Sequence, residues 1–232
     1  MQSYTYLLVD LACIAIPLIA SFYNKHAFYK EWNSFFKANI IVAVLFIIWD
    51  SIFTNIGVWG FNPNYLTGID LGNLPIEEVL FFICIPYCCV FTFFAMKHLI
   101  NKNPFEKIES VLSFTFIIFL LVIGLFHLEK RYTSITFLST SIFLIILKIR
   151  KTNMSYHYLS YFLILPFFFI SNGILTGSFL VKEPIVWYNN TENLGIRISN
   201  IPVEDTMYGM LLIFMNIELY RFFKNKKAKS LS

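Results

Sequence analysis

Charged residues are scarce in this chain. Asp, Glu, Lys and Arg make up 14% of its 232 residues, against roughly 25% in ordinary soluble domains. Hydrophobic residues make up 57%, and the mean hydropathy is +0.66. A water-soluble fold could not bury so much apolar surface, so the composition predicts a membrane protein. The net charge of +4 does not indicate nucleic-acid binding, because the basic residues fall in short loops between apolar runs.

The sequence also lacks the motifs that hold common cofactors. It contains no GxGxxG, Walker loop, nucleophile elbow or HExxH. Its four histidines lie near the ends of apolar runs, without the spacing of a metal site. The cysteines form no CxxC pair, lie inside apolar runs and are interpreted as small hydrophobic residues: Cys13, Cys84, Cys88 and Cys89. We therefore expect no cofactor and no metal.

Long apolar runs dominate what is present. A membrane-spanning helix needs about 20 mostly apolar residues. The first run carries Asp10 and lacks both a basic leader and a cleavage site, so we interpret it as a span and not as a signal peptide. The pattern predicts an all-α polytopic membrane protein with seven transmembrane helices, at residues 4–23, 37–56, 76–96, 110–128, 132–149, 157–180 and 202–222.

The basic residues predict the orientation of these spans. Of the 18 Lys and Arg residues, 14 fall on one side in the seven-span arrangement. The other side has only Lys130, Arg131, Lys182 and Arg197. Cytoplasmic loops carry the excess of positive charge, so we expect the N-terminus outside and the C-terminus in the cytoplasm. For a bacterial chain this would be the inner, or cell, membrane.

The two halves of the chain repeat one pattern. Residues 73–78 read Asn-Leu-Pro-Ile-Glu-Glu, and residues 200–205 read Asn-Ile-Pro-Val-Glu-Asp. Further upstream, Asp50 lines up with Asn172. The copies are four spans apart, so they point the same way, as in parallel repeats whose interface holds the site. We predict a first repeat at 1–100, a connecting span at 101–130, a second repeat at 131–223 and a basic tail at 224–232.

Each repeated motif has two interpretations. Asn caps a helix, Pro75 and Pro202 suit a first turn, and carboxylates favour the positive end of the helix dipole. The alternative is chemical, because ionisable groups in spans usually face a cavity or the bundle interior. Apolar surroundings and like-charge repulsion keep such carboxyl groups from all ionising, so that one could act as a general acid. The acids expected in one layer are Asp10, Asp50, Glu77, Glu78, Glu204 and Asp205.

Aromatic side chains share this predicted layer. They fit an interfacial belt, but aromatic faces beside a carboxylic acid could also stabilise a carbocation. That combination suits protonation of an alkene. With the asparagine opposite Asp50, the candidate substrate-binding residues are Trp49, Trp59, Phe81, Phe82, Asn172, Trp187 and Tyr208.

The two Pro-x-Glu-Glu/Asp motifs, each after an outer loop with Trp and Gly in a tandem set of spans, resemble the lycopene cyclase domain family. Its halves occur as separate subunits of a heterodimeric bacterial enzyme, fused as here, or joined to phytoene synthase in fungi. The resemblance implies a cofactor-free isomerisation of lycopene, a lipid-soluble polyene, through γ-carotene to β-carotene. The acids of the two motifs would supply the catalytic acid and base, and we expect Glu77, Glu78, Glu204 and Asp205 in these roles, with Asp50 as a supporting candidate.

Several alternatives stay open at this point. A carotenoid hydratase would protonate the same alkene and then admit water. A proton-coupled membrane carrier built from parallel repeats would use the same acids to relay protons. The sequence leaves open which acid donates, whether one or both ends cyclise, whether β or ε rings form, and whether the chain associates with other carotenoid enzymes.

Overall fold

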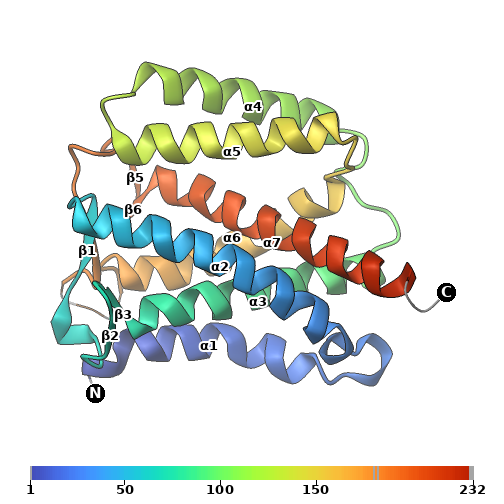
Figure 1. Cartoon of the computed structure of the whole chain (residues 1–232), viewed down its shortest axis with the longest axis horizontal. Coiled ribbons are helices and arrows are strands. Elements are labelled where there is room, and N and C mark those ends of the chain that lie inside the picture. The colour runs from blue at the N-terminus through green and yellow to red at the C-terminus, as the bar shows by residue number, and fades with distance from the viewer. Residues whose placement is uncertain (1, 180, 182, 230–232) are drawn as a thin grey trace.

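Seven α-helices lie side by side in the computed structural model, which describes residues 2–179, 181 and 183–229 (Figure 1). Lys182 and the last three residues of the predicted tail lie outside the described residues. Each helix overlaps a predicted span: α1 (Thr5–Ala20), α2 (Trp32–Asn55), α3 (Ile76–Leu99), α4 (Glu109–Phe126), α5 (Arg131–Ile149), α6 (Ser155–Leu175) and α7 (Val203–Lys229). Helix α2 begins five residues before its predicted span, α6 ends five residues before, and α7 continues seven residues beyond, into the predicted tail. The prediction of an all-α polytopic membrane protein is confirmed.

Helix α7 differs from the other six. Helices α1 to α6 are long and apolar enough to cross a membrane, whereas α7 is not among the helices that meet this criterion. It begins with two acids and carries Asn216 and Glu218 further along. It packs against α2, α5 and α3, and Asn216 is fully buried there. Neighbouring helices therefore shield its polar side chains, and α7 can run through the middle of the bundle (Figure 1).

Short strands connect the helices at one end of the bundle, here called the strand end (Figure 1). Strand β1 (Trp59–Phe61) pairs antiparallel with β4 (Val186–Tyr188), joining the two halves. Two further hairpins lead into α3 and α7, and their strands are β2 (Asp70–Leu71) with β3 (Leu74–Pro75), and β5 (Arg197–Ile198) with β6 (Ile201–Pro202). Each hairpin thus sets where the helix after it begins.

The backbone contacts at this end are repeated between the halves. Asn62 N–H donates to the carbonyl of Ile185 at 2.8 Å, and Asn189 N–H donates to the carbonyl of Val58 at 2.9 Å. Asn189 follows Asn62 by 127 positions, and Ile185 follows Val58 by the same number. The helices exchange partners in the same way, since α2 packs on α7 and α6 packs on α3. These paired contacts describe an approximate two-fold relation between α1–α3 and α5–α7.

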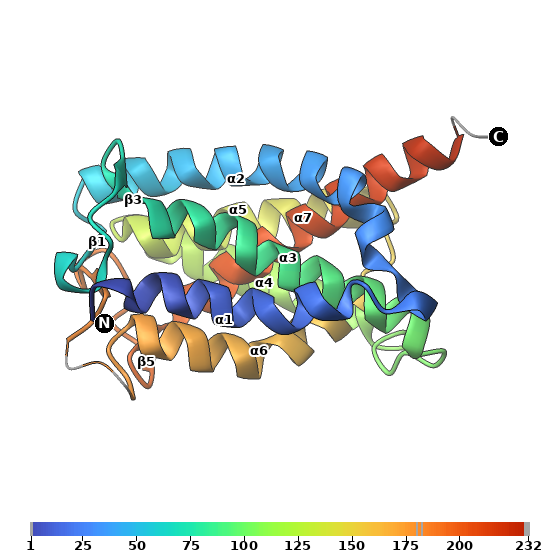
Figure 2. The ribbon, with the colours of Figure 1, turned by 90° about the horizontal axis from the view of Figure 1, so that it is seen from below.

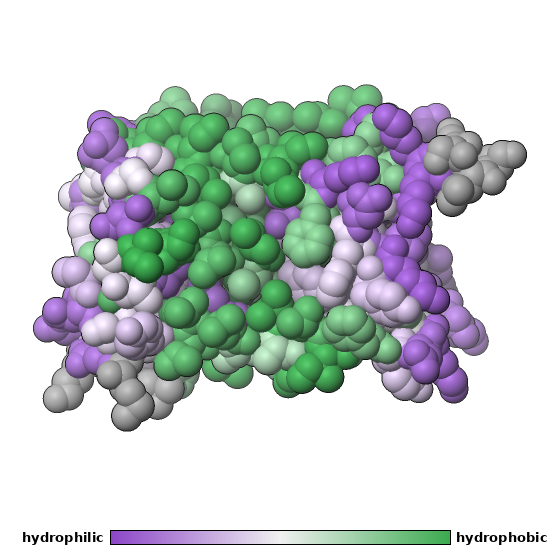
Figure 3. Space-filling view, turned by 60° about the horizontal axis from the view of Figure 1, so that its bottom comes forward, coloured by the Kyte–Doolittle hydropathy of each residue, from purple (hydrophilic) through white to green (hydrophobic). Residues whose placement is uncertain are grey.

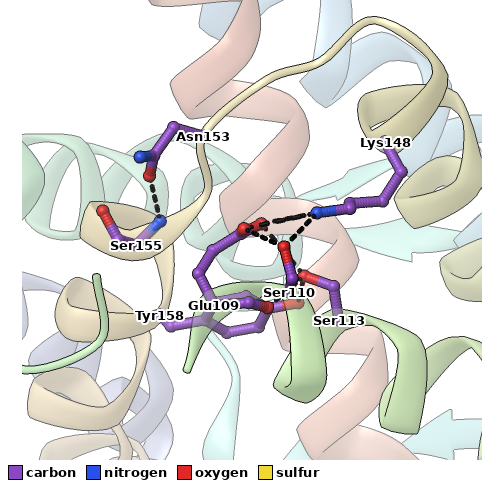
Figure 4. A network of polar contacts seen from close by, with 7 residues as sticks. All are labelled: Glu109, Ser110, Ser113, Lys148, Asn153, Ser155 and Tyr158. Carbon is purple, nitrogen blue, oxygen red and sulfur yellow. Dashed lines mark hydrogen bonds and ion pairs between the residues drawn. The ribbon is translucent and has the colours of Figure 1, made fainter. Parts of the chain in front are cut away.

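Helix α4 lies outside this relation, against α5 (Figure 1). At the end opposite the strands, Lys148 Nζ lies 3.3 Å from Glu109 Oε2, and Glu109 is almost fully buried. Ser113 Oγ contacts both Glu109 and the hydroxyl of Tyr158 from α6 (Figure 4). The network ties α4 to α5 and α6 by polar contacts in an otherwise apolar bundle.

We predict that Lys148→Met lowers the free energy of unfolding by about 1–3 kcal/mol, because it removes the cation from a buried carboxylate. Thermal denaturation of the purified protein in detergent would measure the change. Arg150→Met is the matched control, since Arg150 is exposed at the end of the same helix. Equal melting temperatures for the two variants would contradict this role of the ion pair.

Candidate active site

An elongated apolar cavity of about 760 Å³ lies between α1, α3, α6 and α7. Leu8 and Ile16 of α1 and Phe167 and Ile170 of α6 line it and are also exposed on the outer surface. The two helices run side by side in Figure 2, and apolar residues cover the middle of this side of the molecule in Figure 3. The cavity therefore opens sideways between α1 and α6, at the depth that lipid chains would occupy.

Two acids of the first half reach this cavity. Glu78 lies in the first turn of α3, where its Oε2 accepts a 2.5 Å hydrogen bond from the hydroxyl of Tyr6 in α1. Asp50, near the end of α2, accepts a hydrogen bond from the indole N–H of Trp59. The carboxyl groups of Asp50 and Glu78 also interact electrostatically with each other. Helices α2 and α3 thus bring two carboxyl groups together at the cavity wall.

One acid of the second half reaches the same cavity. Asp205, in the first turn of α7, accepts hydrogen bonds from Tyr132 at 2.5 Å, Tyr188 at 2.9 Å and the Asn172 amide at 2.7 Å. Tyr188 belongs to β4, outside the spans, and burial together with the neighbouring Asp205 charge raises the pKa of its hydroxyl above the ordinary value. Tyr188 therefore remains a hydrogen-bond donor at neutral pH.

The other acid of each motif faces away from the cavity. Glu77 Oε1 accepts a 2.7 Å hydrogen bond from Thr67 N–H, and Glu204 Oε1 accepts one of the same length from Leu194 N–H. Glu204 also accepts from the Thr133 hydroxyl at 2.6 Å. Both side chains are fully buried, and neither lines the cavity. In both halves this glutamate holds the loop that precedes its own helix.

The predicted aromatic layer divides in the same way. Trp59, Phe81 and Tyr208 line the cavity together with Asn172, whereas Phe82, Trp49 and Trp187 do not. Phe82 and Trp49 pack around Phe46, and the Trp187 ring covers Gly60 at the surface. Whether an aromatic side chain lines the cavity depends on the face of the helix or strand on which it lies.

The capping interpretation is wrong for Asn73 of the first motif. Asn73 exchanges hydrogen bonds with Ser51 at the end of α2, and α3 begins after Pro75 without a side-chain cap. Pro75 pairs with Asp70, and Pro202 pairs with Arg197, each at the end of a hairpin. The prolines therefore mark the passage from strand to helix.

Sequence reasoning did not single out the two tyrosines that donate to Glu78 and Asp205. Tyr6 and Tyr132 are each near the start of the first helix of a repeat, 126 positions apart. Aligning those two helices would have placed the tyrosines opposite each other. Their surroundings differ, so the signal consists of one matched residue and is weak in the sequence alone.

Comparison with family models gives one match, described as lycopene cyclase, at residues 3–96 and 129–223. The first range covers α1, α2 and most of α3, the second covers α5, α6 and most of α7, and α4 lies between them. Searches of curated proteins and of solved structures gave no match.

We predict that Glu77→Ala and Glu204→Ala destabilise the protein by about 1–3 kcal/mol each, because a buried backbone N–H loses its acceptor. Glu77→Gln and Glu204→Gln keep an acceptor oxygen and should melt close to the wild type. Thermal denaturation in detergent compares the two pairs. If the glutamine variants were as unstable as the alanine variants, the negative charge and not the hydrogen bond would be the stabilising feature.

Proposed function

The chain belongs to the lycopene cyclase family, and we propose that it cyclises the ψ end groups of lycopene to β-ionone rings, through γ-carotene to β-carotene. The observation that carries the proposal is the convergence of Asp50, Glu78 and Asp205 on one apolar cavity. The reaction needs one acid and one base, with no net oxidation or reduction. Carboxyl groups shielded from water suit both tasks.

The opening of the cavity suits a substrate dissolved in the membrane. A polyene end group could enter between α1 and α6 without passing through water, and the rest of the chain could remain among lipids. The lining is mostly aliphatic and aromatic, and polar groups are concentrated near the strand end. Ligand sites of this kind bind by apolar contact and orient the ligand by a few polar groups.

The aromatic rings around the acids suit the charged intermediates. Protonation of the end group gives a tertiary carbocation, and ring faces attract cations by about 0.5–2 kcal/mol each. Trp59 and Tyr208 line the cavity, and their ring centroids are 6.2 Å apart. We propose that they, with Phe81, stabilise the cation between its formation and its loss.

Expression in a lycopene-accumulating bacterium tests the function. We expect conversion of lycopene to an isobaric carotenoid with β rings, detected by chromatography and mass spectrometry. Glu78→Gln and Asp205→Asn should each eliminate β-carotene, because each removes an acid–base group worth about 10²- to 10⁴-fold in rate. Glu77→Gln and Glu204→Gln serve as matched controls, since these acids do not line the cavity.

The same experiment separates the rival activities. A product heavier by one water molecule would indicate a hydratase. Unchanged lycopene in the presence of well-inserted protein would contradict the proposal and favour a carrier. β-Carotene formation by both cavity variants would show that these acids serve the fold and not the chemistry.

We also propose that the strand end faces outward and that the C-terminus is cytoplasmic. Asn64 is exposed in the strand-end loops, and Lys151 is exposed at the opposite end, so Asn64→Cys and Lys151→Cys place a thiol on each side. A membrane-impermeant thiol reagent added to intact cells should label the first variant and not the second, because most basic residues lie near the second. Exclusive labelling of the second would reverse the orientation.

A further inference from the structure

We propose that the Asp50–Glu78 pair supplies the proton in the cyclisation and that Asp205 removes it. This assignment rests on the proposed function. It comes from a difference between two halves that are otherwise closely alike, and the difference lies in the hydrogen-bond donors around each cavity acid.

The first half brings two carboxyl groups together with few donors. Tyr6 donates to Glu78, Trp59 donates to Asp50, and Thr54 lies 3.4 Å from the same Asp50 oxygen. The other oxygen of Asp50, Oδ2, is buried without a donor among the described residues. The Glu78 carboxyl group is the acidic neighbour with which Asp50 interacts. Two ionised carboxylates side by side in an apolar site repel each other, so the pair favours the state in which it holds one proton.

The second half surrounds one carboxyl group with donors. Both oxygens of Asp205 are engaged, Oδ1 by Tyr132 and Oδ2 by Tyr188 and Asn172. An ionised carboxylate has only acceptor sites, and three donors match them. Asp205 is therefore arranged as the ionised partner, ready to accept a proton from the cavity.

One substitution between the repeats accounts for the different surroundings of Glu78 and Asp205. Asn172 occupies the position in α6 that Asp50 occupies in α2. The Asn172 amide donates to Asp205 but cannot give up its proton. A carboxyl group in the equivalent place, beside Glu78, can hold a proton that is transferable. The exchange of Asp for Asn thus separates the proton-donating half from the proton-accepting half.

The reaction balances on these groups. The pair transfers its proton to C2 of the C1,C2 alkene, leaving a tertiary cation at C1. The π electrons of the C5,C6 alkene form the C1–C6 bond and place the charge at C5. Loss of the C6 proton to Asp205 restores the C5,C6 double bond. Return of that proton from Asp205 to the pair, across the cavity that both line, resets the enzyme.

Product analysis of three variants in lycopene-accumulating cells distinguishes the roles. Asp50→Asn and Glu78→Gln should leave lycopene untouched, with turnover lower by at least about 100-fold, because no proton is delivered. Asp205→Asn should still consume lycopene, but the cation would lose a proton elsewhere, giving ε or γ rings, or would capture water. The reverse pattern, with altered rings from Asp50→Asn and untouched lycopene from Asp205→Asn, overturns the assignment.

Infrared spectroscopy of the purified protein gives a readout that does not depend on turnover. The C=O stretching band of a protonated carboxyl group should lose intensity in Asp50→Asn and in Glu78→Gln and remain unchanged in Asp205→Asn. Asn172→Asp should add intensity, since it creates a second pair. Asp10→Asn is the matched control, because Asp10 is the other fully buried aspartate of the first half and does not line the cavity.

The two tests also separate the failure of this assignment from the failure of the proposed function. If the wild type leaves lycopene unchanged, the function fails, and the infrared spectra still report where the proton is held. If the wild type makes β-carotene but Asp205→Asn loses the carboxyl band and Asp50→Asn keeps it, the function stands and the assignment is wrong.

Discussion

Burying a carboxyl group in an apolar bundle is costly unless it is hydrogen-bonded, and this cost shapes the strand end of the molecule. The cost of leaving such a group without partners is far greater than the gain from any single apolar contact. Tyr6, Tyr132 and the backbone of the long loops supply donors to four acids in the first turns of α3 and α7. The strands, the loops, the packing of α1 on α3 and the packing of α5 on α7 together place those donors.

The two-fold relation places equivalent residues of the two halves in matching positions at this end, so a change of one side chain alters the chemistry of one half only. Strand β1 of the first half pairs with β4 of the second, and backbone N–H groups of each half donate to matching carbonyls of the other. Equivalent acids are therefore held at equivalent depths. At the position of Asp50, the second half has Asn172, whose amide donates to Asp205 but has no transferable proton.

The sequence predicts the helices well and the orientation of side chains poorly. A run of some 20 apolar residues has few alternatives to a spanning helix, so the seven segments were found. Glu77 and Glu78 are adjacent, and helical geometry turns neighbours about 100° apart; which one faces the cavity depends on where α1 and the loop lie. Tyr6 was missed for the same reason, since its importance depends on its contact with a residue 72 positions away.

The distribution of acids in the cavity bears on the choice between an enzyme and a carrier. A proton carrier requires exchangeable groups along a path that reaches both faces of the membrane. The acidic residues lining the described cavity are Asp50, Glu78 and Asp205, at the first turns of α3 and α7 and the end of α2. Farther from the strands the lining becomes apolar, with Ile164, Leu165 and Ile213. An isomerisation returns its proton within the site, so it needs acids at one depth only, and this arrangement suits that requirement.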